Sequence, residues 1–474
     1  MLEQSTLKEV LDVAMANGGD FADIYIEEKS TTGIICEAGN IERVHSGVDA
    51  GAGIRVLSGD TTAYAYTNDL TRQGLLEAAK IISHAAQGDK KEVSLNFTGV
   101  KPLVDFTYRE HPEDVSTDRK VDVVTAADRT ARAIDPDQIK QVIVGYADVV
   151  QKVTIVNSEG VLVEDERLRT RLSVQAVARA GEVIQTGYEA AGSIGGFELF
   201  DRYPPEQVGA EAAERAVRML QADPAPAGRM PVVMAGEAGG TMVHEACGHG
   251  LEADLVQKGL SVYGEKKGQL VASPAVTVID DATLSGRYGS YRFDDEGVPA
   301  RKVELISGGE LTDYLYDRLT ATKEGRESNG HGRRESYQHK PIPRMANTYI
   351  APGKLDPEMI IKETREGLLV KKMGGGQVNT TTGDFVFDVA EGYLIKDGEV
   401  GPMVRGATLT GNGPEVLRMV ELVGSDLGFT IGTCGKDGQG APVSDAQPTL
   451  AIKQLTVGGT AHSAGATTGK IRRI

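Results

Sequence analysis

Six consecutive residues near the middle of the chain could carry out chemistry together: His244-Glu245-Ala246-Cys247-Gly248-His249. Neutral imidazoles are good ligands for zinc. A neighbouring carboxylate can accept a proton from a water molecule that the metal activates. These residue types therefore predict a zinc-dependent peptidase in which His244 and His249 bind the ion and Glu245 is the catalytic carboxylate.

The spacing of the two histidines is unusual for such a site. The familiar zinc-peptidase pattern places its histidines at i and i+4, on one face of an α-helix. His244 and His249 are at i and i+5, so in a regular helix their side chains would point roughly 140° apart. A π-type turn has i→i+5 bonding and brings the two positions back toward one face. We therefore predict a widened helical turn here, made easier by Gly248.

A catalytic zinc site usually has three protein ligands and one open position. Cys434 is the main candidate for the third ligand, because it lies in a glycine-rich stretch, predicted to be a turn, that could bend toward the ion. Cys247 is nearer in sequence but could simply pack into the helix. Glu252 and Asp254 are carboxylate candidates for the same position.

Two further groups could contact a substrate. Arg333, Arg334, His339 and Arg344 form a dense polar cluster. It could bind a substrate carboxylate or stabilise an oxyanion, and it could equally be a structural ion-pair network or a dimer contact.

The run Gly374-Gly375-Gly376-Gln377 could leave backbone groups free to pair with an extended peptide. A tight turn is the competing interpretation. Gly375, Gly376 and Gln377 are therefore candidate substrate-binding residues.

The elements that must position these residues read as mixed α and β. Alternating apolar residues predict short strands within residues 22–67 and antiparallel strands over 139–200, and helical periodicity predicts helices at 70–87, 117–133 and 205–220. Two prolines and a glycine within residues 223–228 predict a linker. We therefore predict an α+β protein with largely antiparallel sheets and two domains, residues 1–222 for dimerisation or substrate enclosure and residues 229–474 for the metal site.

Composition excludes some function classes. Acidic residues outnumber basic ones by 68 − 51 = 17, which argues against nucleic-acid binding. No run of about 18 apolar residues predicts a membrane span, and the N-terminus lacks the pattern of a signal peptide. Three scattered cysteines cannot form a disulfide framework. We expect a cytoplasmic protein without nucleic-acid or membrane partners.

Beyond the histidine pair, the second half of the chain resembles the TldD/PmbA family of metallopeptidases in the order and spacing of its motifs. The first half is similar in length and plan, with weaker motifs. The segments that carry the resemblance are Glu237–Asp281, Asp294–Gly297, Gly332–Tyr337, His339, Pro343–Met345, Gly374–Gln377, Lys396–Gly398, Gly406–Leu409, Cys434–Lys436 and Leu455–Thr460.

The resemblance is to the TldD-type subunit, which keeps the His-Glu-x-x-x-His pattern that the PmbA (TldE) type lacks. It implies one zinc ion per catalytic subunit, held by His244, His249 and Cys434, with Glu245 as the catalytic carboxylate. It also implies cleavage of unfolded or flexible peptides, including peptide maturation. The expected assembly is a homodimer or a heterodimer with a PmbA/TldE-type subunit.

Two other functions share part of this residue pattern. A peptide deformylase also combines two histidines, a cysteine and a glutamate, but it is far shorter and uses the i, i+4 spacing. A non-enzymatic interaction or modulator subunit, with structural zinc or none, is the competing function from outside the enzymes. A closed site with four protein ligands would favour the modulator, because it leaves no position for water.

Overall fold

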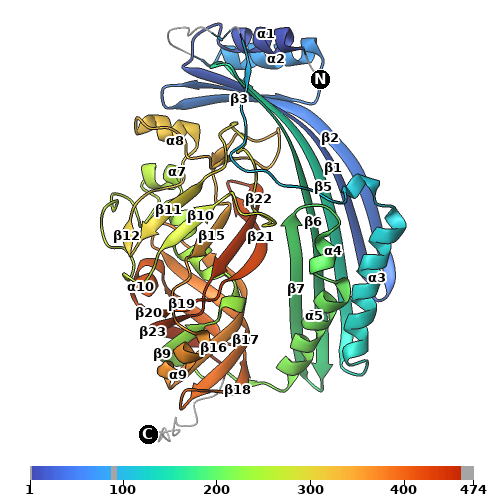
Figure 1. Cartoon of the computed structure of the whole chain (residues 1–474), viewed down its shortest axis with the longest axis vertical. Helices are drawn as coiled ribbons and strands as arrows, with labels where there is room; N and C mark the ends of the chain where they lie inside the picture. Colours follow the sequence, from blue (N-terminus) through green and yellow to red (C-terminus); the bar gives the residue numbers. More distant parts are fainter. Residues whose placement is uncertain (1–2, 87–92, 95, 461–474) are drawn as a thin grey trace, which may run out of the picture.

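The computed structural model describes residues 3–86, 93–94 and 96–460 of the chain. Figure 1 shows an elongated molecule in which long, curved strands of the first half run beside the second half.

The first half is built on one seven-stranded sheet in the order β3-β2-β1-β5-β6-β4, with β7 also paired to β6. All its described pairings are antiparallel except that of the short strand β4. The elements are α1 (Gln4–Ala14), β1 (Phe21–Glu37), β2 (Asn40–Ser58), β3 (Thr61–Thr67), α2 (Arg72–Ser83), β4 (Thr98–Gly99), η1 (Pro112–Asp114), α3 (Thr117–Ile134), β5 (Ile139–Asn157), β6 (Val161–Ala180), β7 (Val183–Ile194), α4 (Leu199–Arg202) and α5 (Pro205–Leu220).

Helices cover this sheet at two places along its length (Figure 1). Helices α1 and α2 share one apolar core with β1 and β2, and α3 and α5 share another with β5 and β6. The helix predicted at 205–220 is confirmed as α5, whose residues Val208, Ala212, Ala216 and Met219 are all buried. The strands are therefore long enough to support two cores in sequence.

The second half contains a six-stranded sheet, an eight-stranded sheet and the pair β13–β14. Its elements are β8 (Asp223–Pro224), β9 (Gly228–Met234), η2 (Gly236–Ala238), α6 (Thr241–Val243), η3 (His244–Gly248), η4 (His249–Leu251), α7 (Ala253–Gln257), β10 (Val278–Asp281), β11 (Lys302–Ser307), β12 (Glu310–Leu311), α8 (Arg318–Lys323), β13 (Gly332–Arg333), β14 (Ile342–Pro343), β15 (Asn347–Ile350), α9 (Pro357–Thr364), β16 (Gly367–Val378), β17 (Asp384–Lys396), β18 (Glu399–Arg405), β19 (Thr408–Asn412), α10 (Gly413–Arg418), β20 (Val420–Val423), β21 (Gly428–Lys436), β22 (Gln439–Gln447) and β23 (Leu450–Gly458).

Two strands of the second half matter most for the site. Strand β21 lies at the edge of the six-stranded sheet and pairs with β22 as a hairpin. Strand β16 lies in the eight-stranded sheet, where it pairs with β17 and, over Leu368–Val370, with β9. The proline-containing segment after α5 is not a free linker, since β8 pairs in parallel with β18.

The predicted α+β class with largely antiparallel sheets is confirmed by these pairings. The prediction of short strands within residues 22–67 is wrong in length, since β1 has 17 residues and β2 has 19. Residues 40–49 of β2 are exposed on both faces, so the alternation that marks a half-buried strand is missing there. Backbone pairing with β1 maintains the strand over this polar stretch.

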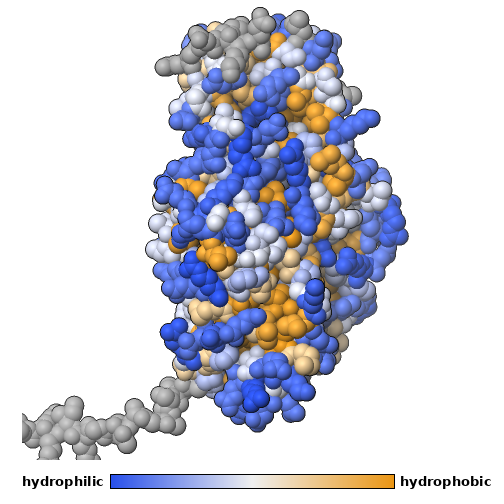
Figure 2. Space-filling view, turned by 60° about the vertical axis from the view of Figure 1, so that its left-hand side comes forward, coloured by the Kyte–Doolittle hydropathy of each residue, from blue (hydrophilic) through white to orange (hydrophobic). Residues whose placement is uncertain are grey.

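Most of the large apolar side chains are buried. The largest buried apolar cluster lies in the second half and includes residues on both sides of the histidine segment. The face shown in Figure 2 is mostly hydrophilic, with an apolar area in its lower half. In the part of the chain that the structure describes, no helix is both long and apolar enough to span a membrane.

Candidate metal centre

The histidine segment forms the widened turn that its spacing predicts. Residues His244–Gly248 are a π-helix between the short α-helix α6 and a 3-10 turn that begins at His249. The rings of His244 and His249 consequently lie next to each other, nearly perpendicular, with centroids 4.9 Å apart. Gly248 leaves room for Met345, because a Cβ at 248 would lie 2.2 Å from the sulfur of Met345 and that side chain would have to move.

Three side chains converge at this turn. One ligand atom each from His244, His249 and Cys434 lie within 4.8 Å of one another, and all three residues are buried or nearly so. Sγ of Cys434 is 3.3 Å from Nε2 of His249. Two imidazoles and one thiol are a donor set typical of zinc, so the residues present fit a zinc ion.

Carboxylates orient both imidazoles. Nδ1 of His244 is 2.7 Å from Asp445, and Nδ1 of His249 is 3.0 Å from Glu252. Because each Nδ1 is engaged in this way, each Nε2 is left to face Cys434. This arrangement fixes the tautomer in which Nε2 can bind a metal.

The sequence does not point to Asp445, which is 201 positions from its histidine. It suggests Glu252 only as a metal ligand, although the i+3 spacing from His249 is a signal for the orienting role. Cys247 points away from the centre and donates to the carbonyl of Val243. Asp254 binds Lys436. Neither Cys247 nor Asp254 therefore joins the ligand cluster.

Cys434 lies in strand β21 opposite Ala441, not in the glycine-rich turn that the sequence suggests. The turn of the hairpin comes after Lys436, the last residue of β21. Arg344 donates to the backbone carbonyl of Cys434, and Lys436 contacts Glu252 at 3.2 Å. A paired strand with these anchors positions the thiol more rigidly than a turn would.

The three groups shift one another's protonation. Burial lowers the pKa of both histidines, but the adjacent carboxylates and Cys434 outweigh it, so that the pKa of His244 lies well above its ordinary value and that of His249 is raised to about 9. Burial raises the pKa of Cys434, but hydrogen bonds from both histidines lower it to about 5. The cysteine is therefore a thiolate at neutral pH, the form that binds metal.

Glu245 faces the same space without orienting either histidine. Burial raises its pKa, although the nearby His244 and His249 act in the opposite direction. A carboxylate with a raised pKa is better suited to hold a proton temporarily than an ordinary surface glutamate.

A cavity of about 830 Å³ opens onto these residues. Its walls come from β7 of the first half, from β16 and β21, and from the histidine segment. The lining residues include Tyr188, Glu189, Ala190, Thr241, His244, Glu245, His249, Lys372, Met373, Gly374, Gly375, Gln377, Val378, Thr430, Ile431, Gly432, Thr433, Cys434 and Asp445. A space of this size accommodates several residues of a peptide.

The glycine run lies along this cavity. Gly375 and Gln377 line it together with Gly374, whereas Gly376 is not among its lining residues. The pairing of β16 with β17 skips from Met373 to Gly376, so the run forms a bulge in a strand and not a tight turn.

The four residues of the polar cluster are not brought together at the cavity. Arg333 donates to the carbonyls of Met345 and Pro442, and Arg334 to that of Asp295. Nδ1 of His339 lies 3.0 Å from the hydroxyl of Ser336. Arg344 donates to the backbone carbonyl of Cys434. All four residues therefore make structural contacts within the chain, one of the roles that the sequence allowed for them.

A buried cluster of potential zinc ligands with an adjacent carboxylate, at the base of a large cavity in an α+β fold, defines a metallopeptidase-like protein. Three family models match the chain: the PmbA/TldA metallopeptidase domain 1 at residues 22–86, the central domain at 110–220 and the C-terminal domain at 227–459. The chain therefore belongs to the TldD/PmbA family of metallopeptidases.

Relatives agree over nearly the whole length. The chain is 36% identical to a metalloprotease TldD homolog of Haemophilus influenzae, covering 97% of each protein. It is 39% identical to a metalloprotease of Methanothermobacter thermautotrophicus, covering 93% of this chain and 96% of that protein. A zinc metalloprotease TldD homolog of Saccharolobus solfataricus is 28% identical, covering 93% and 97%.

Solved structures share the fold. A protein of Thermotoga maritima described as a candidate modulator of DNA gyrase superposes with a TM-score of 0.80 at 25% identity, covering 96% of this chain and all of that one. TldE of Thermococcus kodakarensis superposes with a TM-score of 0.73 at 21% identity, covering 95% and 99%.

Proposed function

We propose that this chain is a zinc-dependent peptidase that hydrolyses unfolded or flexible peptides, with peptide maturation as one use. The observation that carries the proposal is the convergence of His244, His249 and Cys434 beside Glu245 in one cavity. One zinc ion per catalytic subunit would be held by the three ligands. Bound there, zinc would polarise the scissile carbonyl and make water a better nucleophile.

The chain's own residues supply the proton transfers. Glu245 accepts the proton of the attacking water and returns it to the leaving amine, a role that its raised pKa supports. Asp445 and Glu252 keep the two imidazoles in the metal-binding orientation. The thiolate of Cys434 donates more charge than a third imidazole would, so we expect slow turnover on unactivated bonds.

The cavity walls support an extended substrate. The bulge at Gly374–Gln377 and the edge strand β21 both present backbone to the cavity, and a peptide could pair with either. Selection by backbone contacts favours chains without stable structure of their own. We assign Gly375, Gly376 and Gln377 to this surface, Gly376 through its place in the bulged strand.

The two halves have different roles in this proposal. Residues 229–474 carry the metal centre, and residues 1–222 enclose the substrate through Tyr188, Glu189 and Ala190 on β7. The fold likeness to a TldE protein supports pairing with a PmbA/TldE-type subunit, and a homodimer is the other assembly we propose. We place the enzyme in the cytoplasm.

The deciding experiment combines metal analysis with cleavage. Unaltered protein should contain about one zinc per chain, and Cys434→Ala should lose most of it. The matched control Cys247→Ala should retain the metal, because Cys247 bonds only the carbonyl of Val243. Mass analysis of an unfolded peptide should show fragments with the unaltered protein and none with Glu245→Gln, which keeps its zinc. Cleavage by Glu245→Gln would remove Glu245 from the catalytic role.

A modulator without enzymatic activity is the second candidate, supported by the description of the Thermotoga maritima neighbour. It predicts that zinc-loaded protein, alone and mixed with a PmbA/TldE-type subunit, leaves unfolded peptides intact. It also predicts a fourth protein ligand on the ion, which X-ray absorption spectroscopy of the loaded protein would detect. Peptide fragments in either mixture would reject it.

A further inference from the structure

A second, smaller cavity lies between the two halves of the chain, with a volume of about 220 Å³. Strands β1, β5 and β6 form one side, and segments of the second half form the other. Five of its lining side chains are cationic: Lys29, Arg167, Arg169, Arg333 and Arg334. Three are carboxylic acids: Asp294, Asp295 and Glu335.

Two of the arginines have no carboxylate within ion-pair distance among the described residues, although Asp295 and Asp280 lie near enough to Arg333 to act on its charge. Arg169 donates to the carbonyls of Tyr288 and Ser290 at 3.1 Å. Arg333 donates to the carbonyls of Met345 and Pro442 and lies over the ring of Tyr291, 5.1 Å from its centre. Both residues are buried. Within the described part of the chain, neither forms an ion pair. A buried charge that is not directly paired is costly, so these two positions are the natural place for an external anion.

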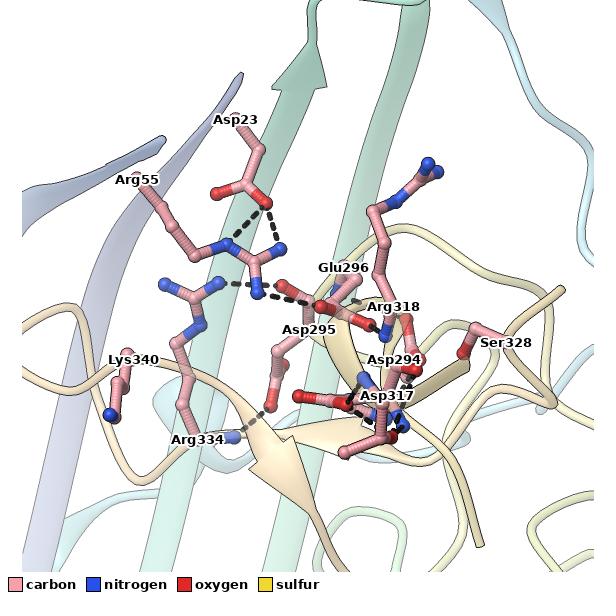
Figure 3. A network of polar contacts seen from close by, with 12 residues as sticks. Asp23, Arg55, Asp294, Asp295, Glu296, Asp317, Arg318, Ser328, Arg334 and Lys340 are labelled. Atoms are coloured by element: carbon pink, nitrogen blue, oxygen red, sulfur yellow. Dashed lines mark hydrogen bonds and ion pairs between the residues drawn. The ribbon is translucent and has the colours of Figure 1, made fainter. Parts of the chain in front are cut away.

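Two of the three acids of the cavity are already engaged, and the third, Glu335, is exposed and accepts from the backbone of Gly440. Asp295 accepts from Arg167 at 2.6 Å and from the backbone of Arg334 at 2.7 Å, as Figure 3 shows for Arg334. Asp294 accepts three backbone N–H groups, and burial together with the nearby Glu296 raises its pKa well above the ordinary value. The excess positive charge of the cavity is therefore not cancelled from within.

The pKa of Arg169 is affected by the excess positive charge of the cavity. Burial and the neighbouring Arg333 and Arg167 lower the pKa of Arg169 to about 10. An anion in the cavity would oppose that effect.

The small cavity adjoins the metal-centre cavity. Thr433 lines both, and it immediately precedes the candidate ligand Cys434 on the edge strand β21. Successive residues of a strand point to opposite faces. A peptide lying along β21 could thus present its backbone near the metal centre and one charged group to the small cavity.

The size of the small cavity limits its ligand. At about 220 Å³ it is below the usual range for a whole small-molecule ligand, roughly 300–1,000 Å³. A carboxylate on a short stem fits, and planar guanidinium groups are matched to carboxylates in geometry.

We propose that Arg169 and Arg333 form a subsite that binds a carboxylate of the peptide substrate next to the site of cleavage. This inference rests on the proposed peptidase function and adds a substrate class: peptides with an acidic side chain or a free C-terminal carboxylate near the scissile bond. The bonds to backbone carbonyls hold the two guanidinium groups in place for this ligand. Arg333 is thus a specificity residue, and Arg169 is one that the sequence did not indicate.

Binding and cleavage are measured separately to test it. Fluorescence anisotropy with the zinc-loaded Glu245→Gln chain compares four labelled, unstructured peptides that carry an acidic side chain, a free C-terminus, both or neither. We expect the carboxylate-bearing peptides to bind roughly ten- to a hundredfold more tightly, as expected for one charge-assisted contact. The peptides with a single carboxylate show whether an acidic side chain or the free C-terminus is responsible for the tighter binding. Equal affinity for all four peptides, or no binding, would overturn the subsite.

Variants test whether Arg169 causes the preference for carboxylate-bearing peptides. Arg169→Gln should remove most of the preference for carboxylate-bearing peptides, and Arg169→Lys should restore part of it. The matched control is Arg179→Gln, because Arg179 lies on the same strand and also donates to a backbone carbonyl, yet is exposed. If Arg169→Gln does not fold, Lys29→Gln at the same cavity should reduce the preference. Equal losses for charged and uncharged peptides would overturn the proposal. Selective binding without cleavage by the unaltered chain would overturn only the peptidase function.

Discussion

At the scale of single residues, the metal centre depends on protons as much as on ligand geometry. Asp445 and Glu252 each engage one Nδ1, and this leaves both Nε2 atoms on the side of Cys434. The same carboxylates favour histidinium when no ion is bound, while the histidines favour a thiolate. Metal binding must therefore displace protons from imidazole and not from sulfur.

Zinc binding should accordingly release protons and strengthen as the pH rises from 7 to 9. His249, with its pKa raised to about 9, is protonated at pH 7 and must lose that proton, whereas Cys434, with a pKa of about 5, has none to lose. Each displaced proton strengthens binding by up to about tenfold per pH unit. Calorimetry at pH 7 in buffers of different ionisation enthalpy measures the release. An affinity that stays constant between pH 7 and 9 would contradict these protonation states.

At the scale of elements, the π-turn is held by what packs around it. The backbone carbonyl of Ala246, in the middle of the turn, accepts a hydrogen bond from Tyr263 at 2.8 Å. Helix α10 begins against the same carbonyl, since a Cβ on Gly413 would lie 2.2 Å from it. A turn of this kind has poor propensity by itself, so these contacts are needed to maintain it.

Gly413→Ala should therefore disturb the metal centre from outside it. The added methyl group meets backbone that a side-chain rotation cannot move away, and we expect a loss of about 1–3 kcal/mol in stability together with weaker zinc binding. Gly47→Ala is the matched control, because nothing lies within 4 Å of its added Cβ. Thermal unfolding and zinc titration of both variants measure the effect. Equal zinc affinity in the two would show that α10 does not support the turn.

At the scale of the whole molecule, buried ion pairs join the two halves. Arg55 of β2 contacts Asp23 of β1 and lies 2.7 Å from Glu296 of the second half, and all three are almost fully buried. Figure 3 shows Arg55 between these two carboxylates. Arg167 of β6 joins Asp295 in the same way, at 2.6 Å. The enclosure of the cavity by the first half depends on this interface.

Arg55→Met should destabilise the protein by about 3–5 kcal/mol, because it leaves two carboxylates buried without their cation. Adding Glu296→Gln should recover part of the loss. Arg109→Met is the control, since its pair with Asp201 is exposed and should contribute little. Denaturant unfolding of the single and double variants gives the comparison. A loss no larger than that of Arg109→Met would show that the Arg55 pairs do not hold the halves together.

The features that could be predicted from the sequence are local ones. Helix α5 begins and ends where its proline and apolar periodicity predict, and the π-turn follows from the spacing of His244 and His249. The length of β2 was not predictable, because its exposed half has no apolar alternation and is stabilised by pairing with β1.

Tertiary structure decided which distant groups complete the site. Asp445 reaches His244 only because β22 packs beside the start of the histidine segment, and Arg169 becomes a buried cation only where β6 meets the second half. Ligand types and local turns depend on neighbours in the chain. Which carboxylate orients a histidine, and which arginine is buried without an ion pair, depends on which surfaces of the folded chain meet. Short-range sequence patterns do not specify those contacts.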